Sequence, residues 1–354
     1  MEEVVDHTGR VFAHKVYGIY GSPTERRRIF DNEIKVIRRL APNHHITRIF
    51  ATYVGTREVG ILLTPVADSG SLDIFLLKAH HGLLTQGELE TLHYSFGCIA
   101  SGLLFMHTQK VRHKDIKPHN ILVHKGSFIY TDFGSSLDYS AATRSVTTGR
   151  PDTITRKYAA PELHDWSPRS SKTDIFSLGC VFLEILGALV LGQIDPTMTP
   201  YGDHTEEIHK YMRKRKTEYD DWIQVVIEMT CKMLHVEPEV RPSARAITGV
   251  LLGCLPDAFC EQCRASLCKA RPMMQTLAVH PSSILLTLPI LVTENSLPSL
   301  LSTTAKSPEE GPHNVADARE FRMSTKKKCP ECGEVSKYWK DHRYGIQIPA
   351  TRCL

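Results

Sequence analysis

The residues best suited to chemistry lie in one run, His113-Lys114-Asp115-Ile116-Lys117-Pro118-His119-Asn120. Asp115 could orient an attacking hydroxyl group and accept its proton, the Asn120 amide oxygen could hold a metal ion, and Lys117 could neutralise charge on a moving phosphoryl group. These residue types in this order indicate phosphoryl transfer from a magnesium nucleotide. Taken alone, the run also fits a polar loop between a helix and a strand.

Two further signatures follow the run in order. Tyr130-Thr131-Asp132-Phe133-Gly134 begins ten residues after Asn120, and Ala160-Pro161-Glu162 comes later. With these three signatures the chain resembles the eukaryotic-type protein kinases over about its first 256 residues. The resemblance implies an α+β fold of two lobes: a small N-lobe built on an antiparallel sheet and a larger, mainly helical C-lobe. The lysine at position 117 is typical of serine/threonine kinases within that family.

The hydrophobic pattern predicts the elements that position these residues. Residues 1–17 predict a β-hairpin with its turn near Gly9, and residues 23–40 predict an amphipathic helix. Extended segments are expected at 47–54 and 58–65. The chain then turns mainly helical, and a long amphipathic helix is expected at 89–107, just before the catalytic run. This order of elements indicates a strand-rich lobe followed by a helical lobe.

An apolar stretch at 175–192 is long enough to suggest a transmembrane segment. It contains Glu184 and follows a charged triplet, so we interpret it instead as a helix surrounded by protein in the C-lobe. The net charge of +4 is too small to indicate binding to a membrane or to nucleic acid. With no signal peptide apparent and cysteines inside apolar runs, we expect an intracellular protein, cytoplasmic or nuclear.

Composition divides the chain into three parts. We expect a kinase-like domain at 1–256 (N-lobe about 1–65, C-lobe about 66–256), a low-order linker at 257–325 and a short unit at 326–354. The linker is rich in Ser, Thr and Pro and lacks helical or strand periodicity.

The resemblance also assigns the residues that would hold ATP and magnesium. Lys15, in the pattern Ala13-x-Lys15 on a strand, would contact the α- and β-phosphates, and Glu33 on the next helix would be its ion-pair partner. Asp132 would hold the magnesium ion that bridges the terminal phosphates, and Asn120 a second metal. An exposed lysine on an edge strand is the alternative interpretation of Lys15.

Supporting and regulatory residues are expected in the C-lobe. Glu162 should pair with Arg241, and Asp174 should brace the backbone of the catalytic loop; helix caps and surface charges are the alternatives. Lys114 stands where the family most often has arginine, so it would receive a phosphate only as a point charge. The segment between Gly134 and Ala160 contains four threonines that are candidate phosphorylation sites: Thr147, Thr148, Thr153 and Thr155.

The glycine-rich loop that covers the ATP phosphates in this family is missing. Only 14 residues precede Lys15, and Gly18 and Gly21 follow it. Two explanations compete: the recorded chain begins too late, or the protein is a degraded, inactive kinase. Because the other catalytic positions are present, we favour an N-terminally truncated kinase domain whose upper sheet lacks a strand.

The tail carries a candidate zinc knuckle, Cys329-Pro330-Glu331-Cys332. A site formed by Cys329, Cys332, His342 and Cys353 is chemically allowed, and a broken finger is the alternative. Cys260-x-x-Cys263 with Cys268 is a weaker candidate.

We therefore expect a serine/threonine kinase that uses ATP and Mg²⁺, with a protein as substrate and a role in signal transduction. A pseudokinase that serves as a scaffold is the first alternative. A zinc-finger protein that binds nucleic acid and carries a vestigial kinase fold is the second.

Overall fold

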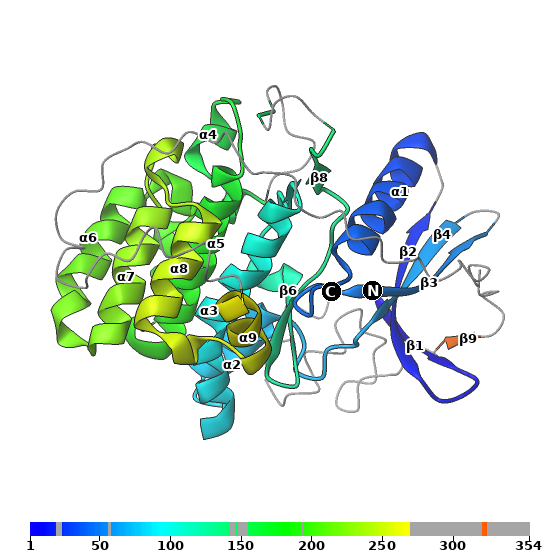
Figure 1. The fold of residues 1–354 in the computed structure, drawn as a ribbon, viewed down its shortest axis with the longest axis horizontal. Helices are drawn as coiled ribbons and strands as arrows, with labels where there is room; N and C mark the ends of the chain where they lie inside the picture. The colour runs from blue at the N-terminus through cyan, green and yellow to red at the C-terminus, as the bar shows by residue number, and fades with distance from the viewer. Residues whose placement is uncertain are drawn as a thin grey trace.

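The structure is a computed structural model, and it describes residues 1–18, 23–55, 58–141, 146–147, 155–192, 194–269 and 321–323. The described part of the chain forms a small sheet-rich lobe and a larger helical lobe, as the sequence indicates (Figure 1). The small lobe contains β1 (Glu2–Asp6), β2 (Val11–Gly18), α1 (Pro23–Leu40), β3 (Arg48–Val54) and β4 (Glu58–Thr64).

Strands β1 and β2 form the hairpin expected near the start of the chain. The Asp6 carboxylate closes its turn by accepting hydrogen bonds from the backbone amides of Thr8 and Arg10, both at 2.9 Å. Gly9 has a φ of 84°, a left-handed conformation that glycine adopts without steric strain. Local turn chemistry therefore fixes this hairpin.

The sheet of the small lobe has five strands in the order β3-β4-β2-β1-β9, all paired antiparallel. The edge strand β9 (Phe321–Met323) comes from the region expected to be a low-order linker. The outer edge of β1 carries backbone N–H and C=O groups that another extended segment can pair with. The upper sheet, which we expected to lack a strand, thus has a fifth one supplied from far along the chain.

Helix α1 packs its apolar side against this sheet (Figure 1). Phe30, Ile37 and Leu40 recur at helical spacing and are almost fully buried. Glu33 lies on the same side and is also buried. A buried carboxylate on an apolar face needs a partner with an opposite charge. Lys15 on strand β2 is that partner.

The larger lobe holds the remaining helices: α2 (Leu72–His80), α3 (Gln86–Thr108), α4 (Pro161–His164), α5 (Lys172–Leu186), α6 (Thr205–Arg215), α7 (Asp221–Met233), α8 (Ala244–Cys254) and α9 (Glu261–Lys269). Short strands surround the catalytic run: β5 (Val111–Arg112) pairs with β8 (Leu137–Asp138), and β6 (Ile121–His124) pairs with β7 (Ser127–Tyr130). Single turns complete the lobe: η1 (Pro118–Asn120), η2 (Arg156–Tyr158), η3 (Gly187–Leu191), η4 (Pro196–Met198), η5 (Tyr201–Asp203), η6 (Lys216–Glu218), η7 (Pro238–Val240) and η8 (Pro256–Ala258).

The apolar stretch expected at 175–192 forms α5 and the turn η3. By length and composition, Lys172–Leu191 is the one helix among the described residues that could cross a membrane, and 78% of its most apolar window is buried in the protein. This burial fits the expected core helix of the C-lobe. The main apolar core continues from this helix through α3 to the inner face of the small lobe.

The packed chain continues past residue 256, where we expected the linker to begin. The turn η8 packs on α3, and α9 follows it (Figure 1). Phe259, which lies between η8 and α9 in the sequence, is completely buried, and Cys263 in α9 is 1% exposed. Two buried apolar side chains explain why this segment is folded although its composition resembles that of the linker.

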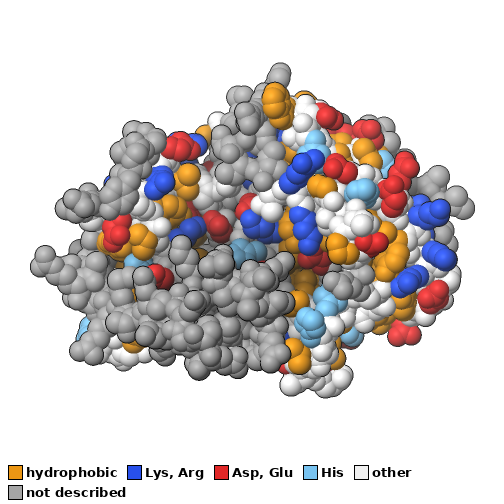
Figure 2. Space-filling model, turned by 180° about the vertical axis from the view of Figure 1, so that it is seen from behind, with side chains coloured by type: hydrophobic (Ala, Val, Ile, Leu, Met, Phe, Trp, Pro, Cys, Tyr) orange, Lys and Arg blue, Asp and Glu red, His pale blue; other side chains and the backbone are white. Residues whose placement is uncertain are grey.

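Basic and acidic side chains are interspersed over the helical lobe on the face that Figure 2 shows. This mixture agrees with the small net charge of +4.

Candidate active site

The catalytic run lies between β5 and β6, and Asp174 at the start of α5 holds its backbone. The Asp174 carboxylate accepts hydrogen bonds from the backbone amides of His113 and Lys114, each at 2.9 Å, and from the His107 ring at 3.0 Å. Lys114 has a φ of 68°, a conformation that costs a residue with a side chain about 1–3 kcal/mol. The buried carboxylate offsets this strain, so Asp174 makes the bracing contacts expected from the sequence.

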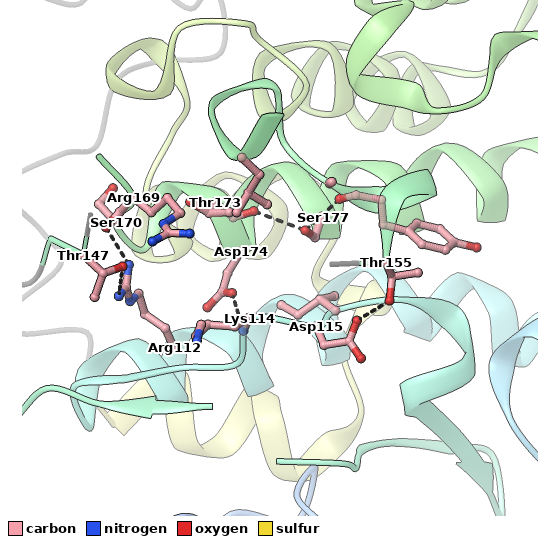
Figure 3. A pocket seen from close by; sticks show the side chains of 14 residues that line it. Arg112, Lys114, Asp115, Thr147, Thr155, Arg169, Ser170, Thr173, Asp174 and Ser177 are labelled. Atoms are coloured by element: carbon pink, nitrogen blue, oxygen red, sulfur yellow. Dashed lines mark hydrogen bonds between the residues drawn. The ribbon is translucent and has the colours of Figure 1, made fainter. Parts of the chain in front are cut away.

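Asp115, Lys117 and Asn120 come together at the end of this loop. Lys117 Nζ lies 2.9 Å from the Asp115 carboxylate. The Asn120 side-chain amide donates to the backbone carbonyl and to the carboxylate of Asp115, both at 2.9 Å. The Thr155 hydroxyl donates to Asp115 Oδ1 at 2.7 Å (Figure 3). It also accepts from Lys117 Nζ at 2.9 Å. A hydroxyl group therefore contacts both the acid and the lysine of the run.

Lys15 and Glu33 form the ion pair expected between β2 and α1. Lys15 Nζ lies 2.9 Å from both carboxylate oxygens of Glu33 and 2.7 Å from Oδ1 of Asp132. The Tyr17 hydroxyl also donates to Glu33, a contact that the sequence did not indicate. The Lys15 side chain is 18% exposed and that of Glu33 is fully buried. The edge-strand interpretation of Lys15 is therefore wrong.

The charges of this group support one another. Burial alone would lower the pKa of Lys15, but the carboxylates of Glu33 and Asp132 raise it well above its ordinary value. Burial acts to raise the pKa of Asp132, and the neighbouring Lys15 outweighs burial, so that pKa is lowered. At neutral pH the two groups are therefore an ammonium and a carboxylate.

Asp132 is held in a strained backbone conformation. Its φ is 64°, and residues kept in this region by their surroundings concentrate at functional sites. The next residue, Phe133, is completely buried, and its ring centroid lies 4.9 Å from that of His113 in the catalytic loop. Because the phenyl ring of Phe133 is packed in place, it helps to set the direction in which the neighbouring Asp132 side chain points.

The residues present fit magnesium, which prefers oxygen ligands. Because Asn120 uses its amide nitrogen on Asp115, its amide oxygen is the atom that can bind a metal. The backbone amide of Thr131 donates to the Asn120 carbonyl at 3.0 Å, which sets Asn120 beside the residue before Asp132. The Asp132 side chain is 43% exposed and can supply carboxylate oxygen.

Two contacts anchor the segment between Gly134 and Ala160 and the helix after it. The Arg241 guanidinium donates to both oxygens of Glu162, at 2.7 and 2.8 Å, and this expected pair is almost fully buried. Arg112 Nη2 donates to the Thr147 hydroxyl at 3.0 Å. Thr148 and Thr153 lie outside the described residues, so they stay candidates from sequence alone.

A pocket beside the catalytic loop is lined by polar and apolar residues of the loop, of the segment between Gly134 and Ala160, and of α4, α5 and the turn between them (Figure 3). Arg112, 2% exposed, donates to the backbone carbonyl of Arg169 at 2.6 Å. Burial lowers the pKa of Arg112. Neither the contacts of Arg112 nor the contact of the Thr155 hydroxyl with Asp115 could be predicted from the sequence, because these contacts join segments far apart in the chain.

The tail residues Cys329, Cys332, His342 and Cys353 lie outside the described residues. The knuckle, and the nucleic-acid reading that depends on it, therefore stay predictions from sequence.

The fold and this arrangement of side chains define a protein kinase domain. The family model described as "Protein kinase domain" matches residues 2–250. Because this match covers more than half of the chain, the chain belongs to the protein kinase domain family.

Similar proteins include several serine/threonine kinases. Serine/threonine-protein kinase CHK1 of Mycosarcoma maydis is 31% identical over 163 residues, 44% of this chain and 23% of the relative. Mitogen-activated protein kinase 16 of Arabidopsis thaliana is 27% identical over 274 residues, 67% of this chain and 46% of the relative. Serine/threonine-protein kinase Nek8 of Danio rerio is 27% identical over 238 residues, which cover 63% of this chain and 30% of the relative. The chain thus spans less than half the length of each of these relatives.

Proposed function

We propose that this chain transfers the γ-phosphoryl group of ATP to a serine or threonine hydroxyl of a protein substrate. The position of Thr155 is the observation that carries the proposal. Its hydroxyl lies 2.7 Å from Asp115 Oδ1 and 2.9 Å from Lys117 Nζ. An aliphatic hydroxyl group can therefore contact both of these side chains at once. The names of the similar proteins support the same acceptor class.

Each residue of the site has a defined task in this reaction. Asp115 accepts the proton of the acceptor hydroxyl and aims its oxygen at the γ-phosphorus, while Lys117 places a positive charge beside the phosphoryl group that is transferred. Lys15 would bind nucleotide phosphates, and Glu33 holds it in position. Asn120 and Asp132 would hold magnesium. When magnesium ATP is bound, the nucleotide supplies the phosphoryl group and the magnesium ion neutralises the charge of that group.

A phosphorylation assay with a generic protein substrate tests the proposal. We expect magnesium-dependent incorporation of phosphate into Ser or Thr, and Asp115→Asn should lower the rate at least about 10²-fold. Binding of Mg-ATP, read as a thermal shift, should survive this substitution. Asp165→Asn removes an exposed carboxylate and is the matched control. Equal rates for the wild type and Asp115→Asn would refute the assigned base.

One observation favours a second candidate, a binding module without turnover. The turn of the β1–β2 hairpin carries a single glycine, Gly9, and Asp6 closes it, so this turn lacks the repeated glycines that let backbone approach phosphate groups. A module of this kind would show no turnover. Magnesium-dependent incorporation of phosphate that Asp115→Asn removes would therefore exclude it.

A further inference from the structure

Four side chains of types that can bind a metal ion meet where α9 packs, outside the active site. His44 and His45 follow α1, whereas Cys260 and Cys263 stand at the start of α9. One ligand atom from each residue lies within 4.8 Å of all the others. The pairs are more than 210 residues apart in sequence, so only the fold brings them together. Cys268, which the sequence groups with the two cysteines, is exposed and does not belong to the cluster.

The distances within the cluster match a tetrahedral ion. A Zn²⁺ ion bound at ordinary bond lengths holds a sulfur and a nitrogen ligand about 3.6 Å apart. The Nε2 atom of His44 lies 3.4 Å from Cys260 Sγ and 3.6 Å from Cys263 Sγ. The Nε2 atom of His45 lies 3.9 Å from Cys260 Sγ and 2.9 Å from Cys263 Sγ. All four sulfur–nitrogen separations scatter around the tetrahedral value.

His45 is already oriented as a metal ligand. Its Nδ1 lies 2.6 Å from the backbone carbonyl oxygen of Phe128, which can only accept, so Nδ1 carries the proton. In the neutral ring Nε2 is then left with a lone pair, and Nε2 is the atom that faces the cysteines. A histidine whose other nitrogen donates to a carbonyl is the usual arrangement in metal sites, because the bond fixes ring and tautomer.

The backbone also places the cysteines. Gly97 in α3 lets η8 approach closely: a Cβ atom there would lie 2.2 Å from the carbonyl oxygen of Ala258. The following Phe259 is buried, and the backbone amide of Cys260 donates to Cys98 Sγ at 3.2 Å. On the other side, the Asn43 side chain accepts from the backbone amide of His45 at 2.8 Å. Both halves of the cluster are therefore held independently of a metal.

Charge and burial favour an ion over an empty polar cluster. His45 and Cys263 are almost fully buried, at 0% and 1% exposure, while His44 and Cys260 are half-buried. Two thiolates neutralise the charge of a divalent ion, so the bound site has no net charge to desolvate. Two sulfur and two nitrogen ligands in tetrahedral array suit zinc rather than magnesium or calcium. We propose that His44, His45, Cys260 and Cys263 bind a structural Zn²⁺ ion.

The ion would join helix α9 to the strand that leads into the active site. The His45 ring donates to Phe128, and the backbone amide of Tyr130 donates to the His45 carbonyl at 2.7 Å. Both partners lie in β7, which ends two residues before Asp132. The metal thus fastens α9, the loop after α1 and β7 at one point. The zinc site would form whether or not the chain has kinase activity.

Metal analysis of the full chain tests the site. Because the tail cysteines could also bind zinc, the parent protein carries Cys329→Ser and Cys332→Ser. We expect the parent, purified from zinc-supplemented culture under reducing conditions, to contain one equivalent of zinc. Adding Cys260→Ser and Cys263→Ser should reduce this to none. Cys254→Ser with Cys268→Ser removes two exposed thiols instead and should leave one equivalent.

A zinc-free parent, or a Cys260→Ser/Cys263→Ser protein that keeps its zinc, would overturn the proposal. So would a Cys260–Cys263 disulfide found by mass spectrometry in the reduced preparation. Cobalt replacement gives a second readout, since a thiolate-bound tetrahedral ion absorbs strongly in the visible region, whereas a pale octahedral spectrum counts against the site.

One further variant guards against misfolding of the cysteine substitutions. His44 is half-buried, so His44→Gln is expected to fold, and it should bind zinc more than tenfold more weakly in a chelator competition. Chelation should also lower the thermal midpoint of the parent by roughly 8 °C or more, the shift expected when zinc exceeds its dissociation constant about a thousandfold. The cysteine variant should show no such shift. Equal zinc affinity in the parent and in His44→Gln would exclude His44 as a ligand.

Discussion

Asp174 is a single side chain on which the geometry of the catalytic loop depends. It accepts hydrogen bonds from two backbone amides and from His107. Burial alone would raise the pKa of this carboxyl group, but the bonds from His107 and the Lys114 amide outweigh burial and lower it. A carboxyl group whose pKa is lower in the folded state stabilises the fold above its unfolded pKa of about 3.9 and loses that contribution as the pH falls through the folded value.

Asp174→Asn is therefore expected to destabilise the protein most at neutral pH. An asparagine amide turned toward donors leaves them unsatisfied, which costs about 2 kcal/mol or more. The difference from the wild type should shrink below about pH 4, where the wild-type carboxylate loses its advantage. Thermal midpoints between pH 7 and pH 3 check this, with Asp165→Asn as control. A difference that is independent of pH would contradict the assignment.

The Glu162–Arg241 pair makes a second prediction for single residues. Arg241 donates to both oxygens of Glu162 and to three backbone carbonyls, those of Lys172, His235 and Val236. Arg241→Met strands a buried carboxylate and these acceptors, so we expect a loss of about 3–5 kcal/mol. Glu162→Gln keeps an acceptor and the shape, and should cost less. Urea unfolding of both variants checks the order; equal losses would show that the carbonyl contacts contribute little.

At the scale of elements, helix α3 contains a matched pair of glycines. A Cβ atom on Gly97 would meet the Ala258 carbonyl oxygen at 2.2 Å and the Phe259 ring at 2.7 Å, whereas a Cβ atom on Gly87 would meet nothing within 4 Å. Gly97→Ala should destabilise by about 1–3 kcal/mol through overpacking. Gly87→Ala should be neutral or stabilise by up to about 1 kcal/mol. Chemical denaturation distinguishes them; a neutral Gly97→Ala would mean that η8 can move away from α3.

Elements with strong local patterns could be predicted from the sequence. The first hairpin, α1 and the strands β3 and β4 occur where periodicity placed them. Helix α3 begins three residues earlier than expected because Thr85 and Glu88 form a capping box, a signal that was present in the sequence as T-x-x-E. Helix α9 and strand β9 could not be foreseen, since their order comes from contacts with α3 and β1 rather than from their own composition.

The same distinction applies to the sites. The catalytic run is compact in sequence, and its spacing carries the chemistry, so Asp115, Lys117 and Asn120 could be named at once. Contacts that cross the fold could not. The sequence suggested zinc at Cys260 and Cys263 only weakly and with Cys268 as third ligand. The histidines that complete the cluster lie more than 210 residues away, and no local spacing encodes that meeting.

At the scale of the whole molecule, the apolar core runs through both lobes, and its last members are on α9. The core includes Phe30 and Ile37 of α1, Phe96 of α3, Phe259 just before α9 and Cys263 within it. The lobes are therefore not independent units in packing terms. Segments after residue 250, where the family match ends, contribute to the same core as the catalytic elements.

Two shortened chains isolate this contribution. A chain ending at residue 269 keeps η8 and α9, and one ending at residue 256 loses them, while both lack everything after 269. The shorter chain gives up Phe259, which is completely buried, and Leu267, which is 8% exposed. Loss of a buried phenyl ring alone costs about 3–5 kcal/mol, so the shorter chain should unfold at a clearly lower urea concentration.

The comparison is made with and without a chelator, because zinc and packing both act through these residues. In chelator the two chains should still differ, since the loss of Phe259 exposes the apolar surface of α3 beside Gly97. When zinc is added and the chelator is left out, the difference between the two unfolding midpoints should be larger, because only the longer chain retains Cys260 and Cys263. Equal midpoints in both conditions would show that α9 rests on the kinase domain without stabilising it. A difference seen only with zinc would assign the whole effect to the metal and none to the packing of Phe259.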